Sequence, residues 1–144
     1  MVALMCEVAQ LTGVERVLEV GTGSGYAAAV LARLAATVYS VECLAQFYER
    51  ARARLEALEI ANVHLSFRDG SEGWPEQAPF DAIVVTAAPR TIPEALKSQL
   101  ADGGRLVIPV GGDVQELRLV TRRGATFEER RLFMVRFVPL VTRP

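Results

Sequence analysis

Short apolar runs alternate along the chain with segments in which apolar residues recur at helical spacing. The apolar runs predict seven strands, over residues 16–20, 37–41, 63–67, 80–86, 105–110, 116–122 and about 131–140. The intervening segments predict helices over residues 2–11, 26–34, 44–58 and 92–100. Such alternation is typical of parallel sheets with helices packed on them. The chain is therefore predicted to be an α/β protein, with a doubly wound, mostly parallel seven-stranded sheet and helices on both faces.

Turn and capping residues mark several of these boundaries. Gly13 follows the first predicted helix and is expected to end it. Thr91 and Glu94 have the spacing of a capping box, which places the start of the fourth helix near Ile92. A turn at residues 123–124 is predicted to join the last two strands as an antiparallel pair. The pattern leaves open the order of these two strands in the sheet.

The segment VLEVGTGSGY, residues 17–26, is the most informative part of the chain. It is an apolar run that ends near Glu19, followed by glycines at positions 21, 23 and 25 and then by a helical pattern. Glycines allow a tight turn and a close approach of the backbone to a ligand. The N–H groups at the start of a helix attract a carboxylate or a phosphate. We therefore expect a ligand cradle here; the alternative is a glycine-rich turn that binds nothing.

The spacing of this loop distinguishes between ligands. The dinucleotide-binding pattern is G-x-G-x-x-G, whereas this loop reads E-x-G-x-G-x-G. An acid beside the loop suits a ligand with an ammonium group better than a pyrophosphate. S-adenosyl-L-methionine has an ammonium and a carboxylate at its methionine end, so we expect Glu19 to face the ammonium and the helix N-terminus to take the carboxylate. The loop residues expected to bind this cofactor are Gly21, Thr22, Gly23, Ser24 and Gly25.

Other candidate residues lie where predicted strands end. In doubly wound sheets, ligands bind beyond the carboxyl ends of the strands, where the strand order reverses. Glu42 ends the second strand seventeen positions after Gly25, near the place of a ribose-binding acid; the alternative is a solvated surface glutamate. Asp69 and Gly70 follow the third strand, and their spacing suits an adenine contact and a plain turn equally. The residues expected to face a methyl acceptor at the end of the fourth strand are Thr86, Ala87 and Ala88.

Few residues qualify as acid–base catalysts. The single histidine, His64, begins a strand on the side away from the ligand, and Asp81 and Glu7 are too scattered to form a triad with it. No cluster has metal-ligand spacing, so no metal is expected. A carboxylate acceptor fits this inventory, because a carboxyl group titrates near pKa 4 and methyl transfer to it needs alignment and desolvation more than a base. No catalytic residue is assigned.

Composition narrows the class of protein. At 144 residues the chain is long enough for one domain, which we expect to cover residues 1–144. A net charge of −1 argues against an extended nucleic-acid surface. No apolar run has the length of a membrane span and no signal-peptide pattern begins the chain, so we expect a cytoplasmic protein without membrane contact. Cys6 and Cys43 are expected to be buried, reduced thiols.

Beyond the glycine loop, four segments resemble the protein-L-isoaspartate O-methyltransferase family of class I S-adenosylmethionine-dependent methyltransferases. They read VYSVE (38–42), RDGSEGWPEQAPFDAIVVTAA (68–88), LADGGRLVIPVG (100–111) and VRFVPL (135–140). Together with the loop they span nearly the whole chain in the order of the family. The loop indicates only the superfamily, whereas the second and the last of these segments are much more specific.

The resemblance implies a Rossmann-like methyltransferase fold and a particular reaction. Members transfer a methyl group from S-adenosyl-L-methionine to the carboxylate of L-isoaspartyl, also D-aspartyl, residues of damaged proteins, and S-adenosyl-L-homocysteine is the product. The ester then collapses to a succinimide, which reopens partly to normal aspartate and so repairs the main chain. The implied partners are isoaspartyl-containing peptides and proteins. The implied cofactor contacts are Glu19 and the loop glycines at the methionine end, Glu42 at the ribose and Asp69–Gly70 at the adenine.

Two departures from the family pattern are visible. Members carry a further N-terminal segment with an Ile-Ser-Gln-Pro-Tyr-like motif, whose serine lies at the active site, before a helix that reads like MVALM. Here that helix begins at Met1, so the family serine is expected upstream of Met1 and no residue of this sequence inherits its role. At the other end the family tends to read VPLT, whereas this chain reads VPLVT at residues 138–142, which makes Thr142 the expected replacement for the family threonine.

Three functions are compatible with the sequence. The first is isoaspartyl methyl transfer, and the second is a class I methyltransferase with another acceptor. The third is a catalytically silent S-adenosylmethionine-binding module, since the segment with the catalytic serine is absent from the sequence. A missing substrate-facing wall is expected to expose apolar surface and to favour self-association through the N-terminal face.

Overall fold

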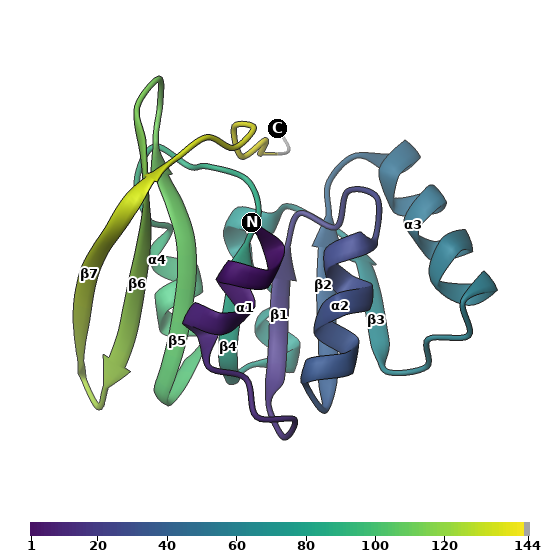
Figure 1. Cartoon of the computed structure of the whole chain (residues 1–144), viewed down its shortest axis with the longest axis horizontal. Coiled ribbons are helices and arrows are strands. Elements are labelled where there is room, and N and C mark those ends of the chain that lie inside the picture. Colours follow the sequence, from purple (N-terminus) through teal and green to yellow (C-terminus); the bar gives the residue numbers. More distant parts are fainter. Residues whose placement is uncertain (143–144) are drawn as a thin grey trace.

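Seven strands form one sheet in the computed structural model, which describes residues 1–142 (Figure 1). The strands are β1 Arg16–Val20, β2 Thr37–Glu42, β3 Val63–Phe67, β4 Phe80–Val85, β5 Leu100–Gly111, β6 Gln115–Arg123 and β7 Thr126–Val135. Their order is β3-β2-β1-β4-β5-β6-β7. The first five strands are parallel, and β6 and β7 each pair antiparallel with the preceding strand. The predicted doubly wound, mostly parallel sheet is confirmed.

Helices cover both faces of this sheet. α1 (Val2–Ala9) and α2 (Tyr26–Leu34) lie on one face, and α4 (Glu94–Ser98) lies on the other (Figure 1). α3 (Ala45–Ala57) packs along β3 and β2. The carboxyl ends of β1 to β4 therefore meet at one edge of the sheet, between the helices.

Alternation along the central strands builds a separate core on each face. Leu18 of β1 packs in the core that includes Leu96 of α4, whereas its neighbour Val17 packs with Met5 of α1 and Leu31 of α2. All five side chains are buried. Successive strand residues point to opposite faces, so a continuous apolar run such as β1 suits a strand covered on both sides. Each such aliphatic side chain contributes about 1.5–3 kcal/mol on burial.

The C-terminal strand differs from its predicted span of residues 131–140. β7 begins at Thr126, and it ends at Val135, which pairs with Gln115 at the start of β6. Beyond this pair β6 offers no partner, so the chain leaves the sheet. The following residues cross above the carboxyl ends of the strands, where Pro139 forms an isolated parallel bridge with Ala88 (Figure 1). β7 lies at the edge of the sheet and β6 lies beside β5, which answers the question of their order.

The helix predicted over residues 92–100 is also shorter than expected. Pro93 is the N-cap of α4, without a side-chain capping bond, so the predicted capping box at Thr91 is wrong. The helix ends at Ser98 because Leu100 already pairs with Phe80 of β4. β5 therefore begins five residues before the predicted start at residue 105.

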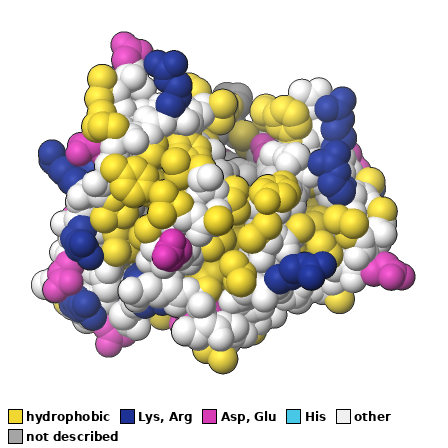
Figure 2. Space-filling view, viewed as in Figure 1, with side chains coloured by type: hydrophobic (Ala, Val, Ile, Leu, Met, Phe, Trp, Pro, Cys, Tyr) yellow, Lys and Arg dark blue, Asp and Glu magenta, His cyan; other side chains and the backbone are white. Residues whose placement is uncertain are grey.

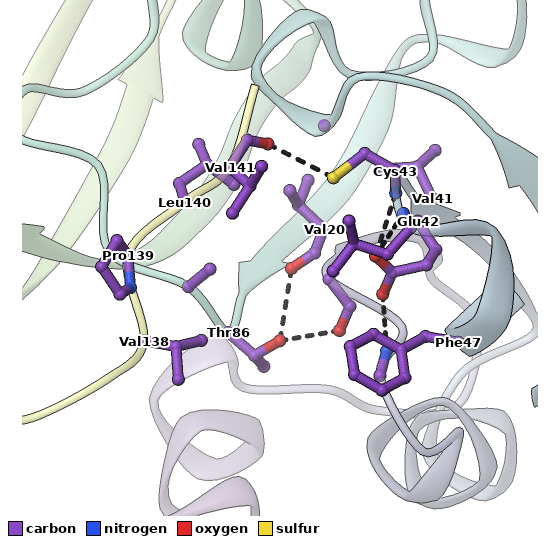
Figure 3. A pocket seen from close by; sticks show the side chains of 15 residues that line it. Val20, Val41, Glu42, Cys43, Phe47, Thr86, Val138, Pro139, Leu140 and Val141 are labelled. Atoms are coloured by element: carbon purple, nitrogen blue, oxygen red, sulfur yellow. Dashed lines mark hydrogen bonds between the residues drawn. The ribbon is translucent and has the colours of Figure 1, made fainter. Parts of the chain in front are cut away.

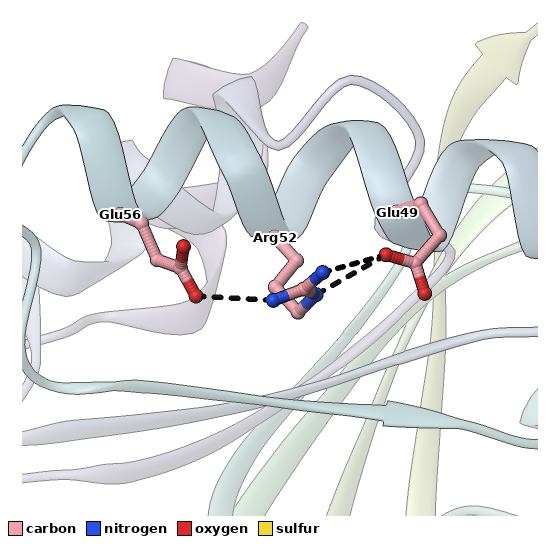
Figure 4. Close-up of polar contacts among 3 residues, drawn as sticks. All are labelled: Glu49, Arg52 and Glu56. Carbon is pink, nitrogen blue, oxygen red and sulfur yellow. Dashed lines mark hydrogen bonds and ion pairs between the residues drawn. The ribbon is translucent and has the colours of Figure 1, made fainter.

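The outer surface of α3 carries an exposed charge cluster. Arg52 lies between Glu49 and Glu56, with 2.8 Å from Arg52 Nη2 to Glu49 Oε2 and 3.3 Å from Arg52 Nη1 to Glu56 Oε1 (Figure 4). All three side chains are at least half exposed, so water and salt screen these ion pairs. The position of α3 depends instead on Ala51 and Leu55, its buried side chains.

Hydrophobic side chains gather on one side of the molecule, over β5, β6, β7 and the neighbouring α1 (Figure 2). The core beneath α1 continues there into partly buried residues of β6 and β7, among them Leu119 and Leu132. Leu4 of α1 and Phe133 of β7 are exposed by 37% and 38%. This surface agrees with the expected apolar area beside the N-terminal helix. Among the described residues, no helix is both long enough and apolar enough to cross a membrane.

Candidate cofactor-binding site

A pocket opens at the point where the strand order reverses, between β1 and β4 (Figure 3). This is the place where doubly wound sheets bind their ligands, because the crossovers to the two sides of the sheet leave a crevice there. The pocket is lined by the ends of β1, β2 and β4, by the start of α3 and by the C-terminal segment. Its lining residues are Val20, Gly21, Gly23, Val41, Glu42, Cys43, Leu44, Phe47, Gly70, Thr86, Ala87, Val138, Pro139, Leu140 and Val141.

The glycine loop after β1 is tied to both neighbouring strands. The N–H groups of Gly21 and Thr22 donate to the carbonyl oxygen of Val41, over 3.0 and 3.3 Å. The Thr86 hydroxyl donates to the carbonyl oxygen of Gly21 over 2.8 Å. Gly21 has a φ of +98°, and a Cβ there would lie 2.9 Å from Thr86 Oγ1. The loop therefore needs glycine at this position for both its backbone angle and its contact with β4.

Glu42 joins the end of β2 to the loop. Its carboxylate accepts the N–H of Gly23 over 2.9 Å, and it accepts the N–H groups of Cys43 and Leu44 over 2.9 and 3.1 Å. Only 7% of the residue is exposed, and it lines the pocket. The structure thus places the predicted ribose-binding acid at the pocket, not on the open surface. It also shows a role that the spacing did not predict, because this carboxylate holds the loop and the start of α3 together.

Glu19 lies behind the loop and outside the pocket lining. Its side chain is fully buried, and Ser40 donates a hydrogen bond of 2.5 Å to its Oε1. Its other oxygen, Oε2, has no hydrogen-bond partner among the described residues. Burial raises the pKa of Glu19 to about 8, although the Ser40 bond lowers it; the nearby Glu42 carboxylate raises it further. Buried polar atoms usually have a hydrogen-bond partner. Glu19 Oε2 has none among the described residues, so it suits a ligand that carries a positive charge.

Of the predicted pair after β3, only Gly70 lines the pocket. A Cβ at Gly70 would overlap the Val20 side chain, so the close approach of this turn to β1 requires glycine. Asp69 instead caps the short turn at residues 70–72, where its Oδ1 accepts the N–H of Ser71 over 2.9 Å. The Asp69 side chain thus has a role in this turn, and its contact with adenine stays a prediction, whereas Gly70 contributes to the pocket.

The remaining loop residues lie around the start of α2. Gly25 is the N-cap of α2 and approaches Ala51 of α3. The Ser24 hydroxyl accepts the N–H of Tyr26 over 3.3 Å. The Thr22 hydroxyl is buried and hydrogen-bonded to Ser40. None of these three predicted cofactor residues lines the pocket, so their contacts with a cofactor stay predictions.

The C-terminal segment forms a wall of the pocket that the sequence analysis missed. Ala88 donates its N–H to the carbonyl oxygen of Val138 over 2.7 Å and accepts the N–H of Leu140 over 2.9 Å. These bonds hold residues 138–141 against the end of β4, next to Thr86 and Ala87. The apolar run VRFVPL was a visible signal, but it was predicted as part of the last strand. Thr142 follows this wall and is exposed, outside the pocket lining.

Three further lining residues follow Glu42 and were also missed: Cys43, Leu44 and Phe47. Their only signal is their place directly after a strand that ends at the ligand edge. The Cys43 thiol donates to the carbonyl oxygen of Val141 over 3.4 Å, which links α3 to the C-terminal wall. Cys6 is buried as predicted and no disulfide joins the two cysteines, but Cys43 is only partly buried, so that part of the prediction is wrong. Cys43 lines the pocket because it directly follows β2, which ends at the edge of the pocket.

The polar residues that were set aside as structural have structural contacts. The His64 ring stacks on Tyr39, with 5.2 Å between ring centroids. Asp81 accepts the N–H of Arg16 over 2.9 Å, at the end of β4 away from the pocket. Within residues 1–142 no three His, Cys, Asp or Glu side chains gather in a way that could hold a metal ion.

The strand order, the glycine loop and the acidic end of β2 together define a Rossmann-like class I methyltransferase fold. The family model described as Protein-L-isoaspartate(D-aspartate) O-methyltransferase (PCMT) matches residues 1–144. The chain belongs to this family.

Relatives and solved structures agree with that membership. The chain is 58% identical over 142 residues to a protein-L-isoaspartate O-methyltransferase of Halorhodospira halophila, covering 97% of this chain and 64% of the relative. It is 52% identical over 140 residues to that of Vibrio atlanticus, covering 97% and 67%. A solved protein-L-isoaspartate O-methyltransferase superposes with a TM-score of 0.91 at 34% identity, covering 96% of this chain and 45% of that one.

A second solved structure contains a ligand. It is a beta-aspartate methyltransferase (PCMT) of Plasmodium falciparum in complex with S-adenosyl-L-homocysteine, with a TM-score of 0.77 at 27% identity, covering 99% of this chain and 72% of that one. The chain spans about two thirds of the length of the curated relatives it matches.

Proposed function

We propose that this chain acts as a protein-L-isoaspartate (D-aspartate) O-methyltransferase, which transfers a methyl group from S-adenosyl-L-methionine to isoaspartyl residues of damaged proteins. The observation that carries the proposal is the pocket at the switch point, where the glycine loop, Glu42 and the C-terminal wall meet. Family membership supports the same reaction. Because the relatives are longer than this chain, the activity of these 144 residues is what the experiment must establish.

The residues present fit the cofactor. The unpartnered oxygen of Glu19 and the loop it supports suit the ammonium end, and we propose that Glu19 acts on that charge from behind the loop. Glu42 retains acceptor capacity for ribose hydroxyls at the pocket surface. Phe47 and Leu140, which line the same pocket as Gly70, give apolar surface for the adenine. The proposal includes a cofactor contact of Thr142, which follows the lining residue Val141 along the chain.

The described side chains suit an acceptor that needs no base. The bound cofactor supplies a methyl group on a positively charged sulfur. An isoaspartyl carboxylate is ionised near neutral pH, because carboxyl groups titrate near pKa 4. Thr86 and Ala87 line the pocket beside the loop, where they would position this acceptor and exclude water. Alignment and desolvation by the pocket walls would therefore be the contribution of this chain to the rate.

A catalytically silent cofactor-binding module is the second candidate. It is favoured by the apolar surface over β5, β6, β7 and α1, which a partner could cover. Transfer to a different acceptor is the third. All three candidate functions share the cofactor pocket, so cofactor binding does not distinguish them. A measurement of methyl transfer is therefore needed.

The test compares an isoaspartyl peptide with its normal aspartyl twin, each incubated with the chain and methyl-labelled cofactor. The proposed function predicts a base-labile methyl ester on the isoaspartyl peptide alone. Binding of S-adenosyl-L-homocysteine in calorimetry without any labelled product would support the silent module. Label on another acceptor would replace the proposed substrate, and absence of binding would remove the cofactor assignment.

We also propose that the apolar surface beside α1 mediates contact between two copies of the chain. Leu4 and Phe133 are exposed there next to partly buried core residues. Light scattering should then report a dimer that the double change Leu4→Ser and Phe133→Ser converts to a monomer. A monomeric parent chain at the same concentration would overturn this proposal. A cytoplasmic location stays a prediction.

A further inference from the structure

Three buried side chains connect the glycine loop to the neighbouring strands β1 and β2. The Thr22 and Ser40 hydroxyls lie 2.6 Å apart, and Ser40 donates to Glu19 Oε1 over 2.5 Å. Thr22 is 3% exposed, and the other two are fully buried. Ser40 stands beside Glu19 in the parallel pairing of β1 with β2, so the strand register itself brings them together. The chain of bonds is thus part of the fold and shielded from water.

The direction of these bonds depends on the proton of Glu19. A hydroxyl has one hydrogen to donate. When Glu19 is ionised, Ser40 must give its hydrogen to the carboxylate, and Thr22 must then donate to Ser40. When Glu19 is protonated on Oε1, it can donate to Ser40, whose hydrogen is then free to turn towards Thr22. The Thr22 hydroxyl therefore changes from donor to acceptor with the charge of Glu19.

We propose that Ser40 is a positioning residue for the proposed methyl transfer: its hydroxyl transmits the protonation state of Glu19 to Thr22 and so makes the cofactor affinity of the glycine loop depend on pH. The inference rests on the proposed function, because it concerns the same pocket. Thr22 acts on the pocket through its neighbours Gly21 and Gly23, which line it.

The surroundings of Glu19 favour such a switch near neutral pH. Burial raises the pKa of Glu19 to about 8, against the lowering effect of the Ser40 bond. The nearby Glu42 carboxylate at the end of β2 raises this pKa further, and the charge of Glu19 in turn raises the pKa of the Cys6 thiol of α1. On the exposed side of the loop, Arg54 of α3 donates to the carbonyl oxygen of Ser24. A cationic ligand group would therefore favour the ionised form of Glu19, and ionisation would favour the ligand.

The test measures the affinity for S-adenosyl-L-homocysteine by calorimetry between pH 6.5 and 8.5 for four proteins. The parent chain should bind more tightly as the pH rises through the pKa of Glu19. Ser40→Ala removes a bond that lowers this pKa, so its binding profile should move to higher pH by about one unit, the size expected for one hydrogen bond to a charged group. Ser40→Thr keeps the hydroxyl and should restore the parent profile. Ser66→Ala, which removes a hydroxyl from β3 bonded to Arg68, is the matched control.

The inference is overturned if the pH profile of binding in Ser40→Ala equals that of the parent chain. It is also overturned if the affinity of the parent chain does not change over this pH range. Hydrogen exchange of the loop amides in the ligand-free proteins separates this result from a failure of the proposed function. Ser40→Ala should speed amide exchange at residues 21–23 about fivefold or more, the change expected when one buried hydrogen bond is lost. Ser40→Thr should leave the exchange rate unchanged. If the parent chain binds no S-adenosyl-L-homocysteine, the proposed function fails, and unchanged exchange in Ser40→Ala would independently remove the role of Ser40.

Discussion

The carboxylate of Glu42 accepts the backbone N–H of Gly23, with 2.9 Å between Glu42 Oε2 and the nitrogen. Glu42, at the end of β2, thus holds the glycine loop that follows the neighbouring strand β1. The other carboxylate oxygen accepts two further N–H groups, at Cys43 and Leu44, so one side chain joins the loop to the start of α3. The local stability of the loop and the proposed contact with the cofactor therefore depend on the same side chain.

Glu42→Ala should lower both the stability of the chain and its affinity for the cofactor product. It leaves three backbone N–H groups without their acceptor, so we expect a loss of about 1–3 kcal/mol in the free energy of unfolding and at least tenfold weaker binding of S-adenosyl-L-homocysteine. Thermal denaturation and calorimetry measure the two effects. Glu56→Ala removes an exposed carboxylate from α3 and should change neither. Parent-like affinity in Glu42→Ala would exclude this residue from the cofactor site.

The free energy of unfolding should fall between mildly acidic and mildly alkaline pH because of Glu19. Its pKa is about 8 in the fold, against an ordinary value of 4.5, so the folded chain binds more protons than the unfolded chain between these values. By linkage, stability falls as the pH rises through this window and the Glu19 contribution levels off above it. At about 1.4 kcal/mol per pKa unit, the effect is on the order of a few kcal/mol.

Glu19→Gln should abolish this dependence and stabilise the ligand-free protein at pH 8. The difference in free energy between parent and variant, measured by urea denaturation at several pH values, isolates Glu19 from the other carboxylates. The same variant should bind S-adenosyl-L-homocysteine more weakly, since it lacks the negative charge. A difference that stays constant from pH 5 to pH 8 would contradict the assignment.

Gly21→Ala should destabilise the chain more than Gly13→Ala. Both glycines have a positive φ, +98° at Gly21 and +105° at Gly13, so alanine strains the backbone at either position. A Cβ at Gly13 meets nothing within 4 Å, whereas one at Gly21 lies 2.9 Å from Thr86 Oγ1. We expect Gly13→Ala to lower the free energy of unfolding by about 1 kcal/mol through backbone strain alone, and Gly21→Ala to lower it by about 1–3 kcal/mol more. Equal losses in urea denaturation would show that the contact with β4 can relax without cost.

Leu140→Ala should lower cofactor affinity through the C-terminal wall. The side chain lines the pocket and packs against the core that α4 covers, so its truncation opens one side of the cavity. We expect roughly three- to tenfold weaker binding and a loss of about 1–2 kcal/mol in stability, because the residue is only partly buried. Val114→Ala, at an exposed position outside the pocket, is the control for both measurements. Unchanged affinity for Leu140→Ala would mean that this wall does not contact the ligand.

Much of the fold was predictable because its signals are local. The apolar runs of β1 and β2 and the glycines after β1 each identify an element within a few residues of sequence. Glu42 was predicted at the ligand edge for the same reason, since the carboxyl ends of parallel strands share one edge. The predicted end of the fourth helix was wrong because Leu100 pairs with Phe80, and no local pattern reports such a pairing.

The sequence by itself determined the alternation of strands and helices, the glycine loop and the family, because apolar periodicity and backbone angles are properties of short segments. Only the tertiary structure decided that residues 138–141 form a pocket wall, that Ser40 lies between Thr22 and Glu19, and that Glu19 keeps an oxygen without a partner. These features depend on which distant segments exclude water from one another. Burial then decides which polar groups are satisfied and at what pH they hold their charge.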